Sequence, residues 1–254
     1  MKSFRYDDGL DFVYRHTDHL ISLAEVLLLD TYHADLLKKG DTVVDLGAGI
    51  GDFSLLASRR VGPNGKVIAL EPNAEDYETL KINIEKNGCT NVIVLNMGVA
   101  GEPGQKEISF WDRRYSFAAD TLENILAHLR IEKKINFIKM DIEGFETGVI
   151  RNSIGTIEQA DVISIELHGT KEEVDRMLQP RRFAFMPSDR WRACKNFVSS
   201  MAAHPRAALE ILLLTAKTYP RIVRMRVNQT RRNDRLITGV YIKPAAGRAA
   251  VVIQ

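Results

Sequence analysis

The chain has 254 residues, of which 45% are hydrophobic and 27% are charged, as in an ordinary α/β domain with additions. This composition excludes a disordered or collagen-like protein, and no apolar run approaches the roughly 20 residues that a membrane span needs. Cys89 and Cys194 are too few for a disulfide-rich scaffold or an all-cysteine zinc site. Met1 to Leu10 lacks the apolar core of a signal peptide, so we expect a cytoplasmic protein.

The net charge of +2 conceals two regions of opposite sign. Residues 1–180 carry 20 basic and 30 acidic side chains, whereas residues 181–254 carry 15 basic and 3 acidic ones. A functional interpretation must therefore explain an acidic body that is followed by a basic C-terminal region.

The first forty residues are expected to be helical, because apolar side chains recur at helical spacing from Asp18 to Leu29. From Asp41 onward, short β-branched runs alternate with amphipathic segments. The expected strands are 42–46, 67–70, 92–95, 136–140, 162–167, 182–186 and 239–242, with an additional short strand at 107–111. The expected helices are 52–60, 75–86, 121–133, 145–152 and 171–178.

This alternation predicts an α/β fold, a doubly wound and mostly parallel seven-stranded sheet with helices on both faces. The sheet is expected in residues 41–190, after an N-terminal helical segment in 1–40. A basic helical insertion follows in 191–235, and the final strand and tail lie in 236–254. In such folds ligands bind beyond the carboxyl ends of the strands, so those positions are where we expect the chemistry.

The first strand ends in a glycine-rich turn, Asp45-Leu46-Gly47-Ala48-Gly49-Ile50-Gly51. Glycine lets the backbone turn sharply and approach a ligand closely. Glu71 follows the second strand, where a carboxylate can accept hydrogen bonds from both hydroxyls of a ribose. The alternative is that Glu71 only neighbours the cap of the next helix. Turn and carboxylate together predict a site for a nucleoside cofactor.

NAD and S-adenosylmethionine (SAM) are the two main candidates for this cofactor. Asp52 stands where a dinucleotide turn has its third glycine, and its charge would repel a pyrophosphate. Asp45 adds a second negative charge at the head of the turn. Because SAM carries a cationic sulfonium and ammonium, these residues favour SAM over NAD.

Acidic residues and a histidine follow the next two strands. Asp141, Glu143 and Glu146 come after strand 136–140, while Glu166 and His168 come at the end of strand 162–167. Crowded carboxylates and a histidine predict a general-base site. The alternative is that the glutamates cap or solvate the helix that follows.

The sequence resembles the FkbM-type SAM-dependent methyltransferases from about Thr42 to Phe185. The matching segments are 45–54, 68–73, 121–122, 138–146 and 165–168. The specific element is Asp141-Ile142-Glu143-Gly144-Phe145-Glu146 after an Ile-Lys-Met strand, whereas the glycine turn is common to all class I methyltransferases. Gly49 is a departure, since this family typically has asparagine there, and the long helical insertion is another.

The resemblance implies a Rossmann-like methyltransferase core, SAM as cofactor with S-adenosylhomocysteine (SAH) as its product, and O-methylation of a small molecule or sugar hydroxyl. It implies that the glycine turn wraps the methionine part of SAM, that Glu71 holds the ribose and that Asp141 lies near the methyl group. The implied cofactor-binding residues are Asp45, Gly47, Ala48, Gly49, Gly51, Glu71, Pro72, Asn96, Met97, Gly98 and Asp141.

The catalytic candidates are Asp141, Glu143, His168 and Glu166, with Glu143, His168 and Glu166, in that order, as candidates for the base. A divalent metal held by these four side chains is possible but not favoured, because they lack a clear ligand spacing.

The basic region leaves several partners open. It could bind RNA or another anionic substrate, or dock on an anionic membrane surface, since apolar residues lie among its charges. It could equally pack against the acidic body or pair two subunits. We therefore expect a SAM-dependent O-methyltransferase for a small metabolite or sugar, with an RNA methyltransferase or a non-catalytic SAM-binding module as alternatives. An NAD-dependent reductase is disfavoured by Asp52.

Overall fold

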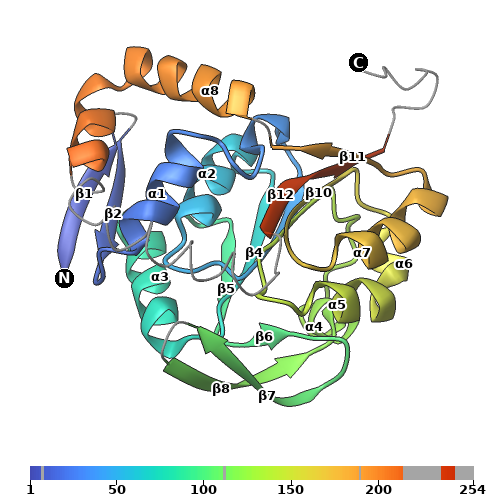
Figure 1. Ribbon diagram of the computed structural model, residues 1–254. Coiled ribbons are helices and arrows are strands. Elements are labelled where there is room, and N and C mark those ends of the chain that lie inside the picture. Colours follow the sequence, from blue (N-terminus) through green and yellow to red (C-terminus); the bar gives the residue numbers. More distant parts are fainter. Residues whose placement is uncertain (7–8, 111–112, 189, 214–235, 244–254) are drawn as a thin grey trace.

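A central sheet of seven strands organises the computed structural model, which describes residues 1–6, 9–110, 113–188, 190–213 and 236–243 (Figure 1). The strands are β3 (Thr42–Leu46), β4 (Lys66–Leu70), β5 (Val92–Leu95), β9 (Phe137–Met140), β10 (Val162–His168), β11 (Ala184–Pro187) and β12 (Leu236–Ile242). Their order is β11-β12-β10-β9-β3-β4-β5, and β12 runs antiparallel to both of its neighbours. The prediction of a mostly parallel seven-stranded α/β sheet is confirmed.

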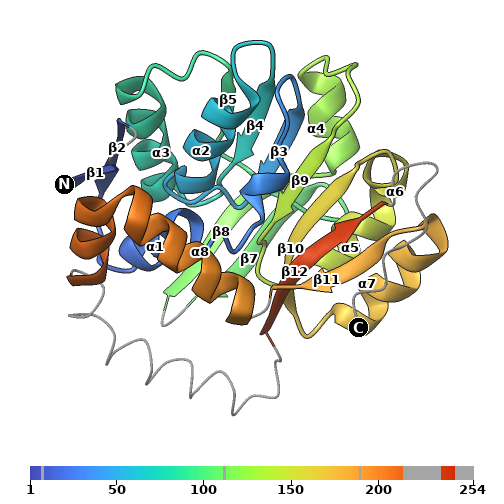
Figure 2. The same ribbon diagram turned by 90° about the horizontal axis from the view of Figure 1, so that it is seen from above.

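Helices cover both faces of this sheet (Figure 2). They are α2 (Asp52–Val61), α3 (Ala74–Lys86), α4 (Leu122–His128), α5 (Glu146–Asn152), α6 (Ile154–Ile157) and α7 (Lys171–Leu178). The side chains of α2 and α3 pack in one apolar cluster with one face of the strands, while those of α4 to α7 pack in a second cluster on the other face. Helix α4 ends earlier than the expected residue 133, since Arg130 adopts a left-handed backbone conformation with a φ of 52°.

The prediction that residues 1–40 are helical throughout is wrong for the first fourteen. Strands β1 (Lys2–Tyr6) and β2 (Leu10–Tyr14) pair as an antiparallel hairpin, and α1 (His19–Leu27) and a 3-10 turn (Ala34–Leu36) follow. Phe4 and Tyr6 are buried on alternate positions of β1, as Leu10, Phe12 and Tyr14 are on β2. This period of two is the pattern of a strand, and it was hidden by the stronger helical pattern that follows it.

A second, three-stranded sheet lies beside the first. It consists of β6 (Gly98–Val99), β7 (Gly104–Phe110) and β8 (Arg113–Asp120), in the order β6-β8-β7. The expected short strand at 107–111 corresponds to β7, whereas β8 was not expected. Strand β8 buries Phe117 and Ala119 and leaves Ser116 and Ala118 exposed, so only one of its faces carries an apolar signal.

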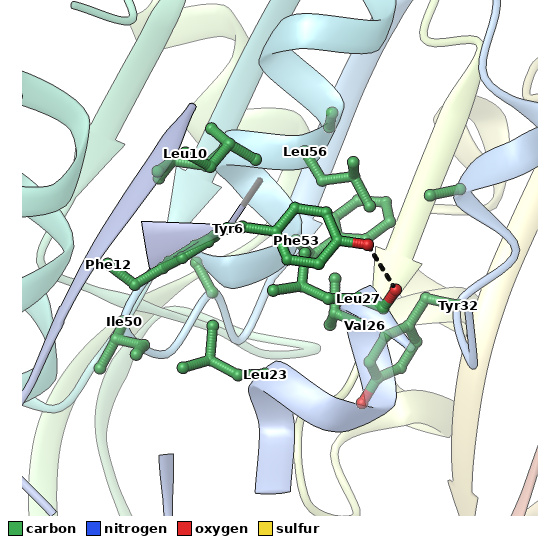
Figure 3. Packing of buried hydrophobic residues seen from close by; sticks show 14 of the residues in the cluster. Tyr6, Leu10, Phe12, Leu23, Val26, Leu27, Tyr32, Ile50, Phe53 and Leu56 are labelled. Carbon is green, nitrogen blue, oxygen red and sulfur yellow. Dashed lines mark hydrogen bonds between the residues drawn. The ribbon is translucent and has the colours of Figure 1, made fainter. Parts of the chain in front are cut away.

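The insertion between β11 and β12 packs on the N-terminal segment. It begins with α8 (Arg190–Ala203), and residues 205–213 are also helical, while residues 214–235 of the predicted helical insertion lie outside the described residues. Ala207, Ala208 and Ile211 join Tyr6 in one buried cluster, part of which Figure 3 shows around Phe53. We call the hairpin, α1, the 3-10 turn, α8 and residues 205–213 the cap.

Ion pairs join the basic region to the acidic body at two places. The guanidinium of Arg192 lies 2.5 Å from a carboxylate oxygen of Asp35 and 3.2 Å from one of Asp30. Arg181 lies 3.3 Å from Glu158. For these two arginines the basic region packs against the acidic body, which was one of the expected alternatives. The arginine clusters at 221–226 and 231–235 lie outside the described residues. No helix of the described chain is long and apolar enough to cross a membrane.

Truncation of Ile211 to alanine is expected to loosen the cap. The side chain is completely buried against the N-terminal cluster, so Ile211→Ala should lower the free energy of unfolding by about 2 to 4 kcal/mol in urea denaturation. The control is Leu209→Ala in the same helical segment, because Leu209 is 51% exposed and should change stability by less than about 0.5 kcal/mol. Equal losses for the two variants would contradict the observed packing.

Candidate functional site

The glycine turn connects β3 to α2, and its glycines are required for two different reasons. A Cβ atom on Gly47 would lie 1.9 Å from the backbone oxygen of Asp141, and one on Gly51 would lie 2.5 Å from the side chain of Leu80. Gly49 meets no atom within 4 Å, but it has a φ of 53°, a conformation that favours glycine. The turn is therefore pressed against the end of β9 at its first glycine and is open at its second.

A cavity of about 220 Å³ opens beside this turn. It is lined by eight of the expected cofactor residues, namely Gly47, Ala48, Gly49, Glu71, Pro72, Met97, Gly98 and Asp141. Ser22 of α1 borders the cavity too, together with Ile108, Tyr115 and Phe117 of the second sheet. Four loops at the carboxyl edge of the central sheet, after β3, β4, β5 and β9, thus form one wall, and segments outside that sheet complete the cavity.

Glu71 lies where the sequence placed it, at the end of β4 and facing the cavity. Its side chain is 7% exposed and accepts hydrogen bonds from the backbone nitrogens of Gly49, at 2.7 Å, and Asn73, at 2.8 Å. Burial raises the pKa of this carboxyl group to about 8, although the two backbone donors oppose the rise. The residue thus joins the glycine turn to the loop after β4.

Three expected cofactor residues do not line the cavity. Asp45 is completely buried behind the turn, where it accepts a hydrogen bond of 2.6 Å from the hydroxyl of Ser54. Asn96 donates to the backbone oxygens of Glu71 and Pro72, and Gly51 packs against α3. These residues shape the loops around the cavity from outside it.

Lys139, on β9, is a residue that the sequence reasoning missed. Its side chain is buried, its amine lies 3.4 Å from a carboxylate oxygen of Asp45, and it donates a hydrogen bond to the backbone oxygen of Gly47. Burial lowers its pKa, but the negative charges of Asp45, Asp141 and Asp52 raise it by more, so the amine stays protonated. Its position inside the Ile-Lys-Met strand was the available signal, because a lysine in a buried strand needs a partner.

The acidic residues after β9 and the histidine of β10 come together as expected. His168 lies between two glutamates, with Nδ1 2.8 Å from Glu146 and Nε2 3.2 Å from Glu143. Burial lowers the pKa of the imidazole, but hydrogen bonds to both carboxylates raise it to about 11. In this arrangement His168 is a cation at neutral pH that donates to both neighbours.

Asp141, Glu143 and His168 could also hold a metal ion. One ligand atom from each lies within 4.8 Å of the others. Glu166, the fourth residue of the expected metal set, is not part of this group among the described residues. Asp141 and Glu143 line the cavity, whereas Glu166 and His168 do not.

Tyr32 is the second residue that sequence reasoning missed. It lies in the cap between α1 and the 3-10 turn, and its hydroxyl is 2.7 Å from Asp141 and 3.2 Å from Glu166. Burial, and then the charge of Asp141, raises the pKa of Glu166 to about 8. No local pattern marks Tyr32, because more than 100 residues separate it from Asp141.

A glycine turn, a carboxylate after the second strand and a cavity at the carboxyl edge of a seven-stranded sheet define the class of SAM-dependent methyltransferases with a Rossmann-like fold. The model of the methyltransferase FkbM domain matches residues 45–188. The chain therefore belongs to the FkbM methyltransferase family, which confirms the resemblance and the enzyme class predicted from the sequence.

Curated relatives match a little more than half of the chain. A probable cobalt-precorrin-6B C(15)-methyltransferase (decarboxylating) of Saccharolobus solfataricus is 28% identical over 160 residues, which are 60% of this chain and 79% of the relative. The hexuronic acid methyltransferase AglP of Haloferax volcanii is 24% identical over 151 residues, or 54% of this chain and 60% of the relative.

Among solved structures, the methyltransferase FkbM from Methylobacillus flagellatus KT is similar with a TM-score of 0.48 and 20% identity. The similarity covers 63% of this chain and 44% of that chain, so the shared part is less than half of that protein.

Substitution of Gly47 tests the close contact between the turn and β9. Gly47→Ala should lower the free energy of unfolding by about 3 kcal/mol, because a methyl group there meets a backbone oxygen in addition to the strain of a positive φ. Gly40→Ala is the matched control, since Gly40 has a φ of 85° and no atom within 4 Å, and should cost only about 1 kcal/mol. Similar costs would mean that φ alone explains the glycine.

The carboxylate of Glu71 is expected to bind the cofactor. Glu71→Ala should weaken SAM binding by about 10-fold or more in calorimetry, because it removes an acceptor for ribose hydroxyls and releases Gly49. The control Glu75→Ala changes an exposed side chain at the start of α3 and should leave the affinity unchanged. Unchanged SAM affinity in Glu71→Ala would contradict the cofactor assignment.

The raised pKa of Glu71 also predicts a pH-dependent stability. Native Glu71 keeps its proton up to about pH 8, whereas an unfolded glutamate with its ordinary pKa of 4.5 has lost it. The native state therefore binds more protons, and the contribution of Glu71 to stability should fall as the pH rises from about 4.5 to about 8. Over this range the unfolding free energy of the wild type should fall relative to that of Glu71→Gln. A difference between the two that does not change with pH would contradict the raised pKa.

Proposed function

We propose that the protein transfers the methyl group of SAM to a hydroxyl of a small metabolite or sugar. The observation that carries the proposal is the cavity itself, which has Glu71 and the glycine turn at one part and the carboxylates of Asp141 and Glu143 at another. The first set suits the nucleoside, and the second suits a reacting centre that is cationic before transfer.

The charge of the lining supports SAM as the cofactor. Asp52, Asp76, Asp141 and Glu143 border the cavity, and the basic residue in its lining is Lys139. Glu71 adds a negative charge only above its pKa of about 8. A pyrophosphate would be repelled there, whereas the sulfonium and ammonium of SAM would be attracted. Within this proposal Glu71 holds the ribose, Met97 and Gly98 lie beside the adenine, and Asp141 faces the methyl end.

The transfer breaks the bond between the sulfur of SAM and the methyl carbon and forms a bond from that carbon to the acceptor oxygen. SAH leaves, and the proton of the hydroxyl passes to a base. We assign this base to Glu143, because it lines the cavity. His168 is already protonated between Glu143 and Glu146, so it orients Glu143 by a hydrogen bond and is unsuited to accept the proton.

The aromatic residues that line the cavity support a sugar as the acceptor. Tyr115, Phe117 and Phe145 are among its lining residues, and aromatic rings of this kind pack well against the apolar face of a sugar. The hexuronic acid methyltransferase among the relatives is consistent with a sugar. RNA remains the alternative acceptor, through the net charge of +12 in residues 181–254.

The test is methyl transfer from labelled SAM to separate pools of hexuronic acids, neutral sugars, phenols and total RNA. We expect label in a small hydroxylated compound, and label only in RNA would replace this proposal by the alternative. Binding of SAM without transfer to any pool would instead support the non-catalytic module.

Glu143→Gln should lower kcat about 100-fold or more while SAM binding in calorimetry changes little, because a neutral amide cannot take the proton. Glu132→Gln, at an exposed position, is the control and should retain full activity.

A chelator should be added in parallel, since Asp141, Glu143 and His168 could hold a cation. Transfer that survives the chelator assigns the step to the side chains alone, and transfer that stops assigns it to a bound metal.

A further inference from the structure

We propose that Tyr32 is a positioning residue, through which the cap holds the carboxylate of Asp141 in place at the wall of the cofactor cavity. The proposal rests on the proposed function, since Asp141 faces the methyl end of SAM there. Tyr32 itself does not line the cavity, so its effect passes through the residue that it binds.

The contact is made by the phenol hydroxyl alone. It lies 2.7 Å from Oδ2 of Asp141, directly after β9, and 3.2 Å from Oε2 of Glu166 in the neighbouring strand β10. A phenol has one proton, so the shorter contact is the one that it donates. A hydrogen bond from a phenol to a carboxyl oxygen is directional, so this contact fixes the orientation of the Asp141 side chain.

The ring of Tyr32 is held as firmly as its hydroxyl. It is 5% exposed, meets Phe53 of α2 edge to face at a centroid distance of 6.1 Å, and lies over the amine of Lys139 at 4.9 Å. The amine in turn binds Gly47 of the cofactor turn. Tyr32 therefore touches both groups that connect β9 to the glycine turn.

Contacts from the C-terminal insertion hold the segment that contains Tyr32. Ser188 donates to the backbone oxygen of Thr31 at 3.1 Å, and Arg192 bridges Asp30 and Asp35. Asn196 of α8 donates to the backbone oxygen of Leu29 at 3.0 Å. The position of the hydroxyl thus depends on segments from both ends of the chain, and the cap and the carboxylate of Asp141 form one unit.

The decisive variant is Tyr32→Phe, which removes the hydroxyl and keeps the ring. We expect kcat for methyl transfer to fall about 10- to 100-fold, while SAM affinity and the acceptor KM change less than about threefold. Tyr6→Phe is the matched control, because Tyr6 is a buried tyrosine of the same cap whose hydroxyl donates to the backbone oxygen of Leu27 at 3.4 Å (Figure 3). Neither Tyr6 nor Leu27 lines the cavity. A purely structural role would lower stability in both variants and leave kcat unchanged.

A double-mutant cycle tests the contact without any acceptor. In urea denaturation each single variant should raise the equilibrium constant for unfolding. The double variant Tyr32→Phe with Asp141→Asn should raise it about tenfold less than the product of the two single increases. For Tyr6→Phe with Asp141→Asn, the increase should equal the product. Additivity for Tyr32 would overturn the proposal, as would a wild-type kcat in Tyr32→Phe. If the wild type transferred no methyl group to any pool, the proposed function would fail, and the cycle would still decide whether Tyr32 holds Asp141.

Arg192→Ala provides a second variant that leaves Tyr32 intact. It releases Asp30 and Asp35 beside the tyrosine, so it should lower kcat in the same direction by a smaller factor, with SAM affinity retained. Full activity in Arg192→Ala would show that the ion pairs of Arg192 do not help to position Tyr32, and would overturn that part of the proposal.

Discussion

The buried ion pair between Lys139 and Asp45 is the constraint on which the centre of the molecule depends. Both side chains are almost without solvent contact, so each needs the other's charge to be tolerated in the core. The pair joins the two middle strands, β3 and β9, and the second bond of the amine holds Gly47. Because Gly47 also touches the backbone of Asp141, the glycine turn and the acidic strand end have one relative position.

The cavity follows from this arrangement but is not completed by it. The loops after β3, β4, β5 and β9 supply one wall, and α1 and the second sheet supply the other. Most of the ionisable groups that face the cavity are acidic, so the site is suited to a cationic ligand whatever its exact pose. The interior of the fold thus sets the chemistry of the site, while the added segments set its size and access.

The cap also explains part of the charge asymmetry. Arg192, from the basic region, pairs with Asp30 and Asp35 of the acidic body, so its positive charge is neutralised within the chain. The same contact fixes the segment that carries Tyr32. Assembly of the two ends of the chain and the geometry of the acidic strand ends are therefore physically linked.

The sequence by itself determined the seven strands, most helices, the glycine turn and the carboxylates of Glu71, Asp141 and Glu143, because each is a local pattern of hydropathy or spacing at a strand end. It did not reveal the hairpin of residues 2–14, strand β8 or the places of Lys139 and Tyr32. Those depend on contacts between distant residues, such as the bond from Tyr32 to Asp141. Only the tertiary structure decided them, because a buried polar side chain is defined by the partner that packing brings to it, and not by its neighbours in the chain.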